Sequence, residues 1–289
     1  MMGKKEALLT AARKSFHAAL LDSVLNVDSA GVPTNADKAN RASIAIAKGI
    51  IERVGHHTGS ERMAGQSSGD QFEGICAEYI RSTFNALGHM RPGKWTISKG
   101  VGGGRLGIAR FEQYSHLDAL AELASKTPEL AAALGSDYLI KPDVVIYREP
   151  EPDETFNAAG PVVSSKEALY TGLRAYNGSM PILHASISCK WTLRSDRAQN
   201  ARSEGLNLVR NRKGRLPHIT VITGEPTPSR ISSIALGTGD IDHVYHFALH
   251  ELLETVKDLG MTDAEDSINT MILGKRLRDI SDLPLDLIV

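Results

Sequence analysis

The feature that most constrains the fold is a stretch whose apolar spacing changes from two residues to nearly four. Between residues 183 and 191, apolar side chains occupy every second position, which predicts a β-strand. From residue 195 onward, small and apolar residues recur every three to four positions, which predicts a helix with Ser195 as a candidate N-cap. A further apolar run at 219–222 predicts another strand. This order favours an α/β fold with a right-handed crossover between parallel strands.

A glutamate lies on or beside the face of this helix that would pack against the sheet. Glu204 is one turn from Ala201 and one turn from Leu208. A carboxylate in such a place is unfavourable unless something charged meets it. The candidates are a metal ion and Lys190, near the end of the predicted strand.

A second carboxylate precedes another apolar run. Asp143 comes directly before residues 144–147, which predict a buried strand, and we expect Asp143 just inside the sheet. It also needs a cationic or hydrogen-bonding partner. The simplest hypothesis is a divalent cation held by carboxylates beside a lysine, with four residues around it: Asp143, Ser188, Lys190 and Glu204.

These residues resemble the signature of PD-(D/E)XK nucleases, in the variant used by type II restriction endonucleases that cut CCGG-core sites. The matching motifs are Pro142-Asp143, Ser188-Cys189-Lys190 and Glu204. In the general pattern, a carboxylate stands two residues before the lysine. Ser188 holds that place here, and in this subgroup a glutamate on the following helix, matching Glu204, supplies the missing charge. The likeness is close from 184 to 228 and looser over nearly the whole chain.

The resemblance implies a restriction-endonuclease-like α/β core, in which a central mixed sheet is flanked by helices, with helical additions at the N-terminus. We expect one domain over residues 1–289. Its helical N-terminal part would cover 1–90, the catalytic core about 70–225, and the C-terminal part 226–289.

The activity implied is Mg²⁺-dependent hydrolysis of double-stranded DNA at a palindromic CCGG-core site. The expected site is GCCGGC, cut after the first G to leave a four-base 5′ overhang with 5′-phosphate ends. Asp143 would bridge one or two Mg²⁺ ions. The backbone carbonyl of Cys189 and water-mediated contacts from Glu204 and Glu73 would complete the oxygen-rich shell that hard cations prefer.

The other catalytic roles also follow from the resemblance. Lys190 would hold the scissile phosphate, and Ser188 would keep a hydrogen-bonding role. Glu73 falls one residue off the apolar stripe of its predicted helix, so composition alone favours a solvated side chain. The resemblance instead places Glu73 at the edge of the active site.

Base recognition is expected from the segment that follows the lysine strand. Arg194-Ser195-Asp196-Arg197 resembles the base-reading segment of the subgroup. Two cations at a helix N-terminus oppose the helix dipole and Asp196 compensates only one, so a partner explains them better. Arginine pairs with guanine O6 and N7, and aspartate accepts from cytosine N4, which suits a G/C-only site. Gln66 matches a residue that reaches the minor groove, although composition alone makes its loop a surface connection.

Charge is informative only in its distribution. The net charge is −1, which by itself does not favour nucleic-acid binding. Residues 190–215, however, contain eight Lys/Arg and only two acidic residues. We interpret this segment as a basic stripe along one cleft for a phosphate backbone.

The expected partners are double-stranded DNA and further copies of the chain. A palindromic site requires two-fold symmetric subunits, and members of this subgroup commonly pair two dimers into a tetramer. The acidic, proline-rich segment 149–154 predicts an exposed excursion suited to subunit contacts. A cognate DNA methyltransferase is expected in the same system. No apolar run approaches the ~18 residues of a membrane span, and Cys76 and Cys189 alone favour a reducing compartment, the bacterial cytoplasm.

Three other interpretations stay open. His243, His246 and His250 fall at helical spacing and suggest zinc, but their order differs from the metalloprotease helix and an ordinary half-buried helix is favoured. The chain could also be a PD-(D/E)XK repair or recombination nuclease without strict specificity, or a DNA-binding module that has lost its chemistry. Plasmid cleavage distinguishes a site-specific nuclease from one without strict specificity. Lys190→Ala distinguishes a nuclease, which should lose cleavage and keep binding, from a binding module, whose behaviour should not change.

Overall fold

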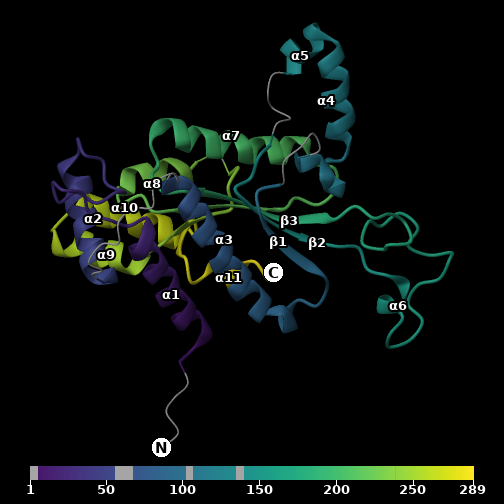
Figure 1. Cartoon of the computed structure of the whole chain (residues 1–289), viewed down its shortest axis with the longest axis horizontal. Coiled ribbons are helices and arrows are strands. Elements are labelled where there is room, and N and C mark those ends of the chain that lie inside the picture. The colour runs from purple at the N-terminus through teal and green to yellow at the C-terminus, as the bar shows by residue number, and fades with distance from the viewer. Residues whose placement is uncertain (1–5, 56–67, 102–106, 135–139, 238) are drawn as a thin grey trace, which may run out of the picture.

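A mixed β-sheet forms the centre of the computed structural model, which describes residues 6–55, 68–101, 107–134, 140–237 and 239–289 (Figure 1). The sheet has six strands in the order β1-β2-β3-β4-β5-β6. β1, β2 and β3 pair antiparallel, whereas β3 through β6 pair parallel. The strands are β1 (Trp95–Lys99), β2 (Val144–Arg148), β3 (Ile182–Lys190), β4 (His218–Thr223), β5 (His243–His246) and β6 (Leu277–Asp279).

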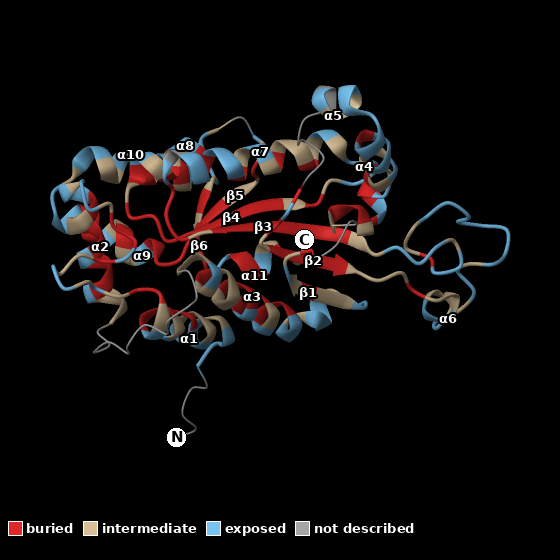
Figure 2. Ribbon diagram, turned by 45° about the horizontal axis from the view of Figure 1, so that its top comes forward, coloured by how far each residue is buried: buried red, intermediate tan, exposed pale blue. Residues whose placement is uncertain are grey.

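Helices cover both faces of the sheet, which confirms the predicted fold class. Figure 2 shows α7, α8 and α10 along one face and α1, α3 and α11 along the other. The α-helices are α1 (Leu8–Ser23), α2 (Arg41–Val54), α3 (Ser68–Ala86), α4 (His116–Lys126), α5 (Pro128–Leu134), α6 (Asp153–Phe156), α7 (Ser195–Asn211), α8 (Pro228–Ala235), α9 (Leu249–Asp258), α10 (Thr262–Leu273) and α11 (Leu283–Asp286). Three short 3₁₀ segments are η1 (Gly88–Met90), η2 (Gly107–Arg110) and η3 (Glu112–Tyr114).

Strand β3 lies in the middle of the sheet and is buried on both faces. Ala185 and Ile187 are fully buried, and the alternating polar residues Ser186 and Ser188 are buried as well. Helix α7 joins β3 to the parallel strand β4, as the spacing predicted. Gly205 allows α7 to pack closely, because a Cβ at this position would lie 2.8 Å from the carbonyl oxygen of Asp240.

Two details at the ends of these elements differ from the prediction. α7 begins at Ser195, so its N-cap is Arg194, whose side chain makes no capping hydrogen bond. Asp143 lies one residue before β2 instead of inside it. Its backbone carbonyl still accepts the Gly100 N–H at 2.7 Å, while its carboxylate turns to donors on β3. Asp143 is therefore hydrogen-bonded to the ends of neighbouring strands without being part of a strand itself.

The histidines do not share a helix, so that prediction was wrong. His243 and His246 belong to β5, and His250 lies in α9. His246 is fully buried, and burial lowers its pKa to about 4. Within the described ranges, no group of three or more His, Cys, Asp or Glu side chains is placed to hold a metal ion. None of the helices in these ranges is long and apolar enough to span a membrane.

Residues 149–181 form an arm that extends away from the sheet between β2 and β3 (Figures 1 and 2). A buried arginine organises it: Arg174 donates to both carboxylate oxygens of Asp153 at 2.7 and 2.6 Å and to the Ser164 carbonyl at 2.6 Å. Tyr170 on this arm is 97% exposed and Tyr176 is 65% exposed. The chain leaves the sheet after β2 as predicted, but the predicted segment 149–154 is not exposed as a whole, because Glu151 is buried and only Glu154 is exposed. The exposed aromatic side chains lie further along the arm.

Candidate active site

The C-terminal end of β3 carries a partly buried ion pair. The Lys190 Nζ lies 2.6 Å from Oδ2 of Asp143, and the same oxygen accepts the Cys189 backbone N–H at 2.7 Å. The antiparallel register places the start of β2 beside this end of β3, which brings Asp143 to the lysine. Burial disfavours the ammonium charge, but Asp143 and Glu204 outweigh it and raise the pKa of Lys190. The lysine is therefore a fixed cation at neutral pH.

Helix α7 brings a second carboxylate to this ion pair. The hydroxyl of Ser188 donates to Oε2 of Glu204 at 3.3 Å. The other oxygen, Oε1, is buried and has no hydrogen-bond partner among the residues that the structure describes. Burial and the negative charge of Asp143 raise the pKa of Glu204 to about 7. The helix thus holds a carboxylate with one unpartnered oxygen. It lies next to Ser188, which stands where the general nuclease pattern has its acidic residue.

Glu73 lies at the edge of this cluster, on the first half of α3. Burial and the charge of Asp143 raise its pKa. Its Oε2 lies 3.9 Å from Nζ of Lys99, a lysine that also pairs with Asp70. No hydrogen bond joins Glu73 to the other predicted catalytic residues in the described ranges. A direct role in holding a metal is therefore less well supported for Glu73 than for Asp143 or Glu204.

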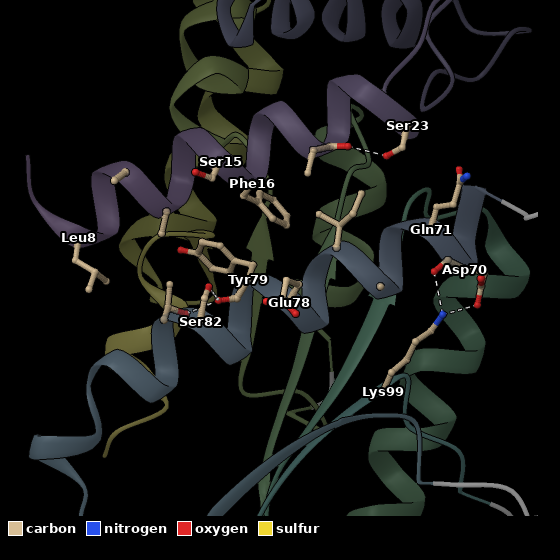
Figure 3. A pocket seen from close by; sticks show the side chains of 16 residues that line it. Leu8, Ser15, Phe16, Ser23, Asp70, Gln71, Glu78, Tyr79, Ser82 and Lys99 are labelled. Carbon is tan, nitrogen blue, oxygen red and sulfur yellow. Dashed lines mark hydrogen bonds and ion pairs between the residues drawn. The ribbon is translucent and has the colours of Figure 1, made fainter. Parts of the chain in front are cut away.

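A larger hollow nearby is not the site of this chemistry. A cavity of about 810 Å³ lies between α1 and α3, and Figure 3 shows Phe16 and Tyr79 in it. Only its end at Asp70 and Lys99 approaches the catalytic cluster. Its lining is mostly apolar and contains neither of the partly buried carboxylates Asp143 and Glu204. We therefore place the candidate site at the charged cluster and not at the cavity.

The cluster fits a hard cation bound with few protein ligands. Mg²⁺ is usually bound through one or two carboxylates, with waters and substrate phosphates filling the other positions. The unpartnered Oε1 of Glu204 is a buried acceptor that a cation would satisfy. Asp143 and Glu204 are close enough for the charge of one to raise the pKa of the other. The described ranges contain no group of three His, Cys, Asp or Glu side chains placed to hold a metal, so this pair of carboxylates is better suited to Mg²⁺ than to zinc, which is held in closed cages.

The predicted base-reading segment begins four residues after Lys190, at the N-terminus of α7. The side chains of Arg194, Asp196 and Arg197 are exposed. The Arg197 guanidinium donates to the Thr192 hydroxyl at 2.9 Å. The helix therefore presents two cations and one carboxylate to solvent, directly beside the charged cluster. Gln66, expected to contribute from another loop, lies outside the described residues.

Sequence reasoning missed two residues on this surface. Arg194 lines a hollow of about 560 Å³ together with Asp37 and Arg230. Asp37 and Arg230 form an ion pair, and the hydrogen bond from Arg230 is the main reason that the pKa of Asp37 is lowered. The loop before α2 and the first turn of α8 bring these residues together. No local pattern could have identified them, because the three residues come from distant parts of the chain.

The basic residues of segment 190–215 are spread along the whole length of α7. α7 has 17 residues, and a rise of about 1.5 Å per residue makes it roughly 25 Å long. Lys190 and Arg194 lie at one end of it, whereas Arg212 and Arg215 follow its other end. Arg202 lies near the middle of α7, so the basic residues follow the helix from end to end, and Lys190, Arg194 and Arg197 are the ones at the end that carries the catalytic cluster.

The chain is similar in sequence to known restriction enzymes over nearly its whole length. The family model described as NgoMIV restriction enzyme matches residues 16–289. The type II restriction enzyme NgoMIV of Neisseria gonorrhoeae is 58% identical over 283 residues, which cover 98% of this chain and 99% of that enzyme. Among solved structures, a chain of the restriction endonuclease PspGI–substrate DNA complex matches with a TM-score of 0.26 and 15% identity, covering 97% of this chain and 91% of that one. This last likeness is too weak to support a conclusion.

Proposed function

The chain belongs to the NgoMIV family of type II restriction endonucleases, which are DNA-cleaving hydrolases, and we propose that it cuts palindromic CCGG-core sites with Mg²⁺. One observation carries the proposal. An aspartate, a lysine and a glutamate from three separate segments of the chain meet at the end of β3, directly before a helix that presents Arg194, Asp196 and Arg197 to solvent. Such an arrangement combines phosphate chemistry with a means of reading bases.

Mg²⁺ would be held by Asp143 and the Cys189 backbone carbonyl, with Glu73 reached through water. For Glu204 we replace the water-mediated contact expected from the sequence with a direct one, because its Oε1 is buried and unpartnered among the described residues. When bound, one or two such ions lower the pKa of an attacking water and neutralise charge that develops at phosphorus. The support for this ligand set is the pair of close carboxylates and the unpartnered Oε1 of Glu204. Oxygen donors of this kind are those that Mg²⁺ prefers.

The chain's own residues would position the substrate and offset charge. Lys190, held by Asp143 at 2.6 Å, offers its ammonium group to the scissile phosphate. Because its pKa is raised, this group stays charged throughout the reaction. Ser188 donates to Glu204 and orients that carboxylate without acting as a nucleophile. The products would be a 5′-phosphate and a 3′-hydroxyl.

The proposed sequence is GCCGGC, cut after the first G to leave a four-base 5′ overhang. Arg194 and Arg197 would donate to guanine O6 and N7, and Asp196 would accept from cytosine N4. Asp37 and Arg230 share the hollow with Arg194, so we add them to the base-facing surface. Gln66 would act from the minor-groove side.

A palindromic site further implies a two-fold symmetric homodimer, and we propose that two dimers associate. The arm of residues 149–181 is the proposed contact between subunits, because it leaves the sheet and exposes Tyr170 and Tyr176. A cognate DNA methyltransferase would protect the host genome. Both proteins would act in the bacterial cytoplasm, where that genome lies.

The test is plasmid cleavage with Mg²⁺, followed by mapping of the cut ends. We expect discrete fragments whose 5′-phosphate ends all fall after the first G of GCCGGC. A smear or random nicks would favour a repair or recombination nuclease without strict specificity. Binding without cleavage, unchanged in Lys190→Ala, would favour a non-catalytic DNA-binding module.

A further inference from the structure

A fully buried glutamate lies between the catalytic strand and the base-facing surface. Glu225 is 0% exposed and follows β4 by two residues. Its Oε2 accepts the Leu193 backbone N–H at 2.8 Å, and its Oε1 accepts the Thr227 backbone N–H at 3.1 Å. One carboxylate therefore holds two chain segments, which lead into α7 and α8.

Both segments end in residues of the base-facing hollow. Leu193 directly precedes Arg194, and Thr227 is the N-cap of the helix that carries Arg230. The Arg230 guanidinium also lies 3.8 Å from Oε1 of Glu225. The relative placement of Arg194 and Arg230 is thus fixed through a single side chain that does not face solvent.

The same glutamate is linked to the catalytic lysine. The hydroxyl of Thr223 donates to the Lys190 carbonyl at 2.8 Å and accepts the Glu225 N–H at 3.1 Å. The Glu225 carbonyl is in turn held by Nε2 of the buried His246 at 3.1 Å. A continuous set of hydrogen bonds therefore joins the backbone of Lys190 to the backbone before Arg194.

Burying a carboxylate is unfavourable, and an apolar side chain of similar volume often stabilises a protein equally well. Here each oxygen is used by a backbone N–H of a segment that bears a DNA-facing arginine. We propose that Glu225 is a positioning residue that sets the base-reading arginines in register with Lys190. This role rests on the proposed function, because it concerns how DNA reading is aligned with cleavage.

The test compares Glu225→Gln with Asp279→Asn, a second buried acid that lies in another polar cluster. The amide presents an NH₂ group to one of the two backbone N–H donors, which loses its acceptor. For each protein, kcat and KM are measured on a GCCGGC duplex and on duplexes with one base pair changed. We expect Glu225→Gln to lose at least about tenfold in discrimination, mainly through KM for the cognate duplex. Asp279→Asn should lower the melting temperature and leave the discrimination unchanged.

Hydrogen exchange provides a readout that does not need cleavage. In Glu225→Gln, faster exchange should be confined to the backbone amides of residues 191–194 and of Thr227, Ser229 and Arg230. Thr223→Val is nearly isosteric and should still fold, and we expect it to loosen the same amides while leaving those around Asp279 protected.

Equal discrimination in Glu225→Gln and wild type, or unchanged protection of the Leu193 amide in both variants, would overturn the positioning role even if wild type cuts as proposed. Failure of the wild type to cut GCCGGC with Mg²⁺ would instead overturn the proposed function and, with it, this inference.

Discussion

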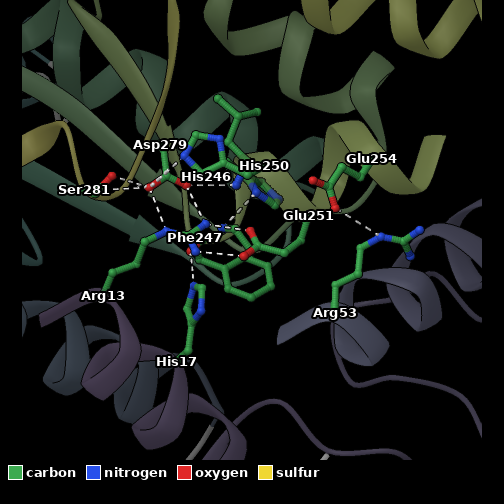
Figure 4. A network of polar contacts seen from close by, with 12 residues as sticks. Arg13, His17, Arg53, His246, Phe247, His250, Glu251, Glu254, Asp279 and Ser281 are labelled. Atoms are coloured by element: carbon green, nitrogen blue, oxygen red, sulfur yellow. Dashed lines mark hydrogen bonds and ion pairs between the residues drawn. The ribbon is translucent and has the colours of Figure 1, made fainter. Parts of the chain in front are cut away.

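Two clusters of buried charge lie on the same sheet and differ in how completely they are satisfied. In the first, which we call the β6 cluster, Arg13 of α1 donates to both oxygens of Glu251 at 2.7 and 2.6 Å and to both oxygens of Asp279 at 2.9 Å (Figure 4). Asp279 also accepts from the backbone N–H groups of Leu249 and Ser281. Every carboxylate oxygen of this cluster has a donor.

The second, the β3 cluster of Asp143, Ser188, Lys190 and Glu204, is left incomplete. Oε1 of Glu204 is buried without a partner in the described part of the chain. The pKa values differ accordingly: burial raises that of Glu204 to about 7, whereas hydrogen bonds from Arg13 and Ser281 overcome burial and hold that of Asp279 at about 2. A satisfied cluster fastens one element to another. An unsatisfied one, placed beside exposed arginines, is suited to a ligand that is absent from the chain itself.

The largest expected difference between the clusters concerns catalysis. Lys190→Ala should lower single-turnover cleavage at least about 10³-fold, because a preorganised charge at the phosphate is removed. Duplex binding without Mg²⁺, measured by fluorescence anisotropy, should remain. The exposed Lys38, which pairs with Asp28, provides the control Lys38→Ala with unchanged cleavage. Cleavage by Lys190→Ala at the wild-type rate would contradict the assignment of catalysis to the β3 cluster.

The reverse result is expected in the β6 cluster. Arg13→Met leaves Glu251 and Asp279 without their cation and should lower the free energy of unfolding by about 3 kcal/mol. Denaturant unfolding measures this change. Cleavage per folded molecule should stay at the wild-type level at low temperature. A large loss of kcat at full folding would mean that the two clusters are not separate in function.

The pH dependence of stability should have opposite signs in the two clusters when Mg²⁺ is removed. The pKa of Glu204 rises from 4.5 to about 7 on folding, so its contribution is present below 4.5 and is lost as the pH rises through about 7. The pKa of Asp279 falls from 3.8 to about 2, so its contribution is present above 3.8 and is lost as the pH falls toward 2.

Glu204→Gln tests this sign directly. At about pH 8, the metal-free variant should be more stable than wild type by on the order of 3 kcal/mol, since the pKa rises from 4.5 to about 7 and one pKa unit corresponds to ~1.4 kcal/mol. The gain should vanish near pH 4, where Glu204 is protonated in both states. Urea unfolding at the two pH values gives the comparison. If the variant were less stable than wild type at both pH values, the charged Glu204 carboxylate would not be destabilising, and our description of it as unsatisfied would be contradicted.

The smallest expected effect belongs to the edge of the β3 cluster. Glu73→Gln should lower kcat by about tenfold or less, because within the described ranges Glu73 makes no hydrogen bond to the catalytic residues and would act through water. Cleavage rates over a series of Mg²⁺ concentrations measure this, and the loss should shrink as Mg²⁺ rises. A loss as large as that of Lys190→Ala would instead make Glu73 a direct participant.

Local spacing and the physics of burial were sufficient to predict much of this molecule. The period change after residue 191 predicted β3, α7 and β4, and the need of a buried carboxylate for a partner brought Asp143, Lys190 and Glu204 together before any coordinates. These predictions succeeded because each residue carries its own signal, an acid or a base in an apolar pattern.

The failures involve contacts that spacing does not encode. The helical spacing of His243 and His246 is equally compatible with a short strand followed by a turn, and pairing with β4 decides the outcome. Asp37, Arg230 and Glu225 reach the surroundings on which their proposed roles rest only when loops from distant parts of the chain meet.

The most direct test of the central claim is to locate the metal. Crystals of Lys190→Ala bound to a GCCGGC duplex would be soaked in Mn²⁺ and examined by anomalous diffraction. The account predicts a peak at about 2.1 Å from oxygens of Asp143 and Glu204, and none at Glu251 and Asp279. A peak only in the β6 cluster, or metal bound to the DNA without contact to Asp143 or Glu204, would contradict it.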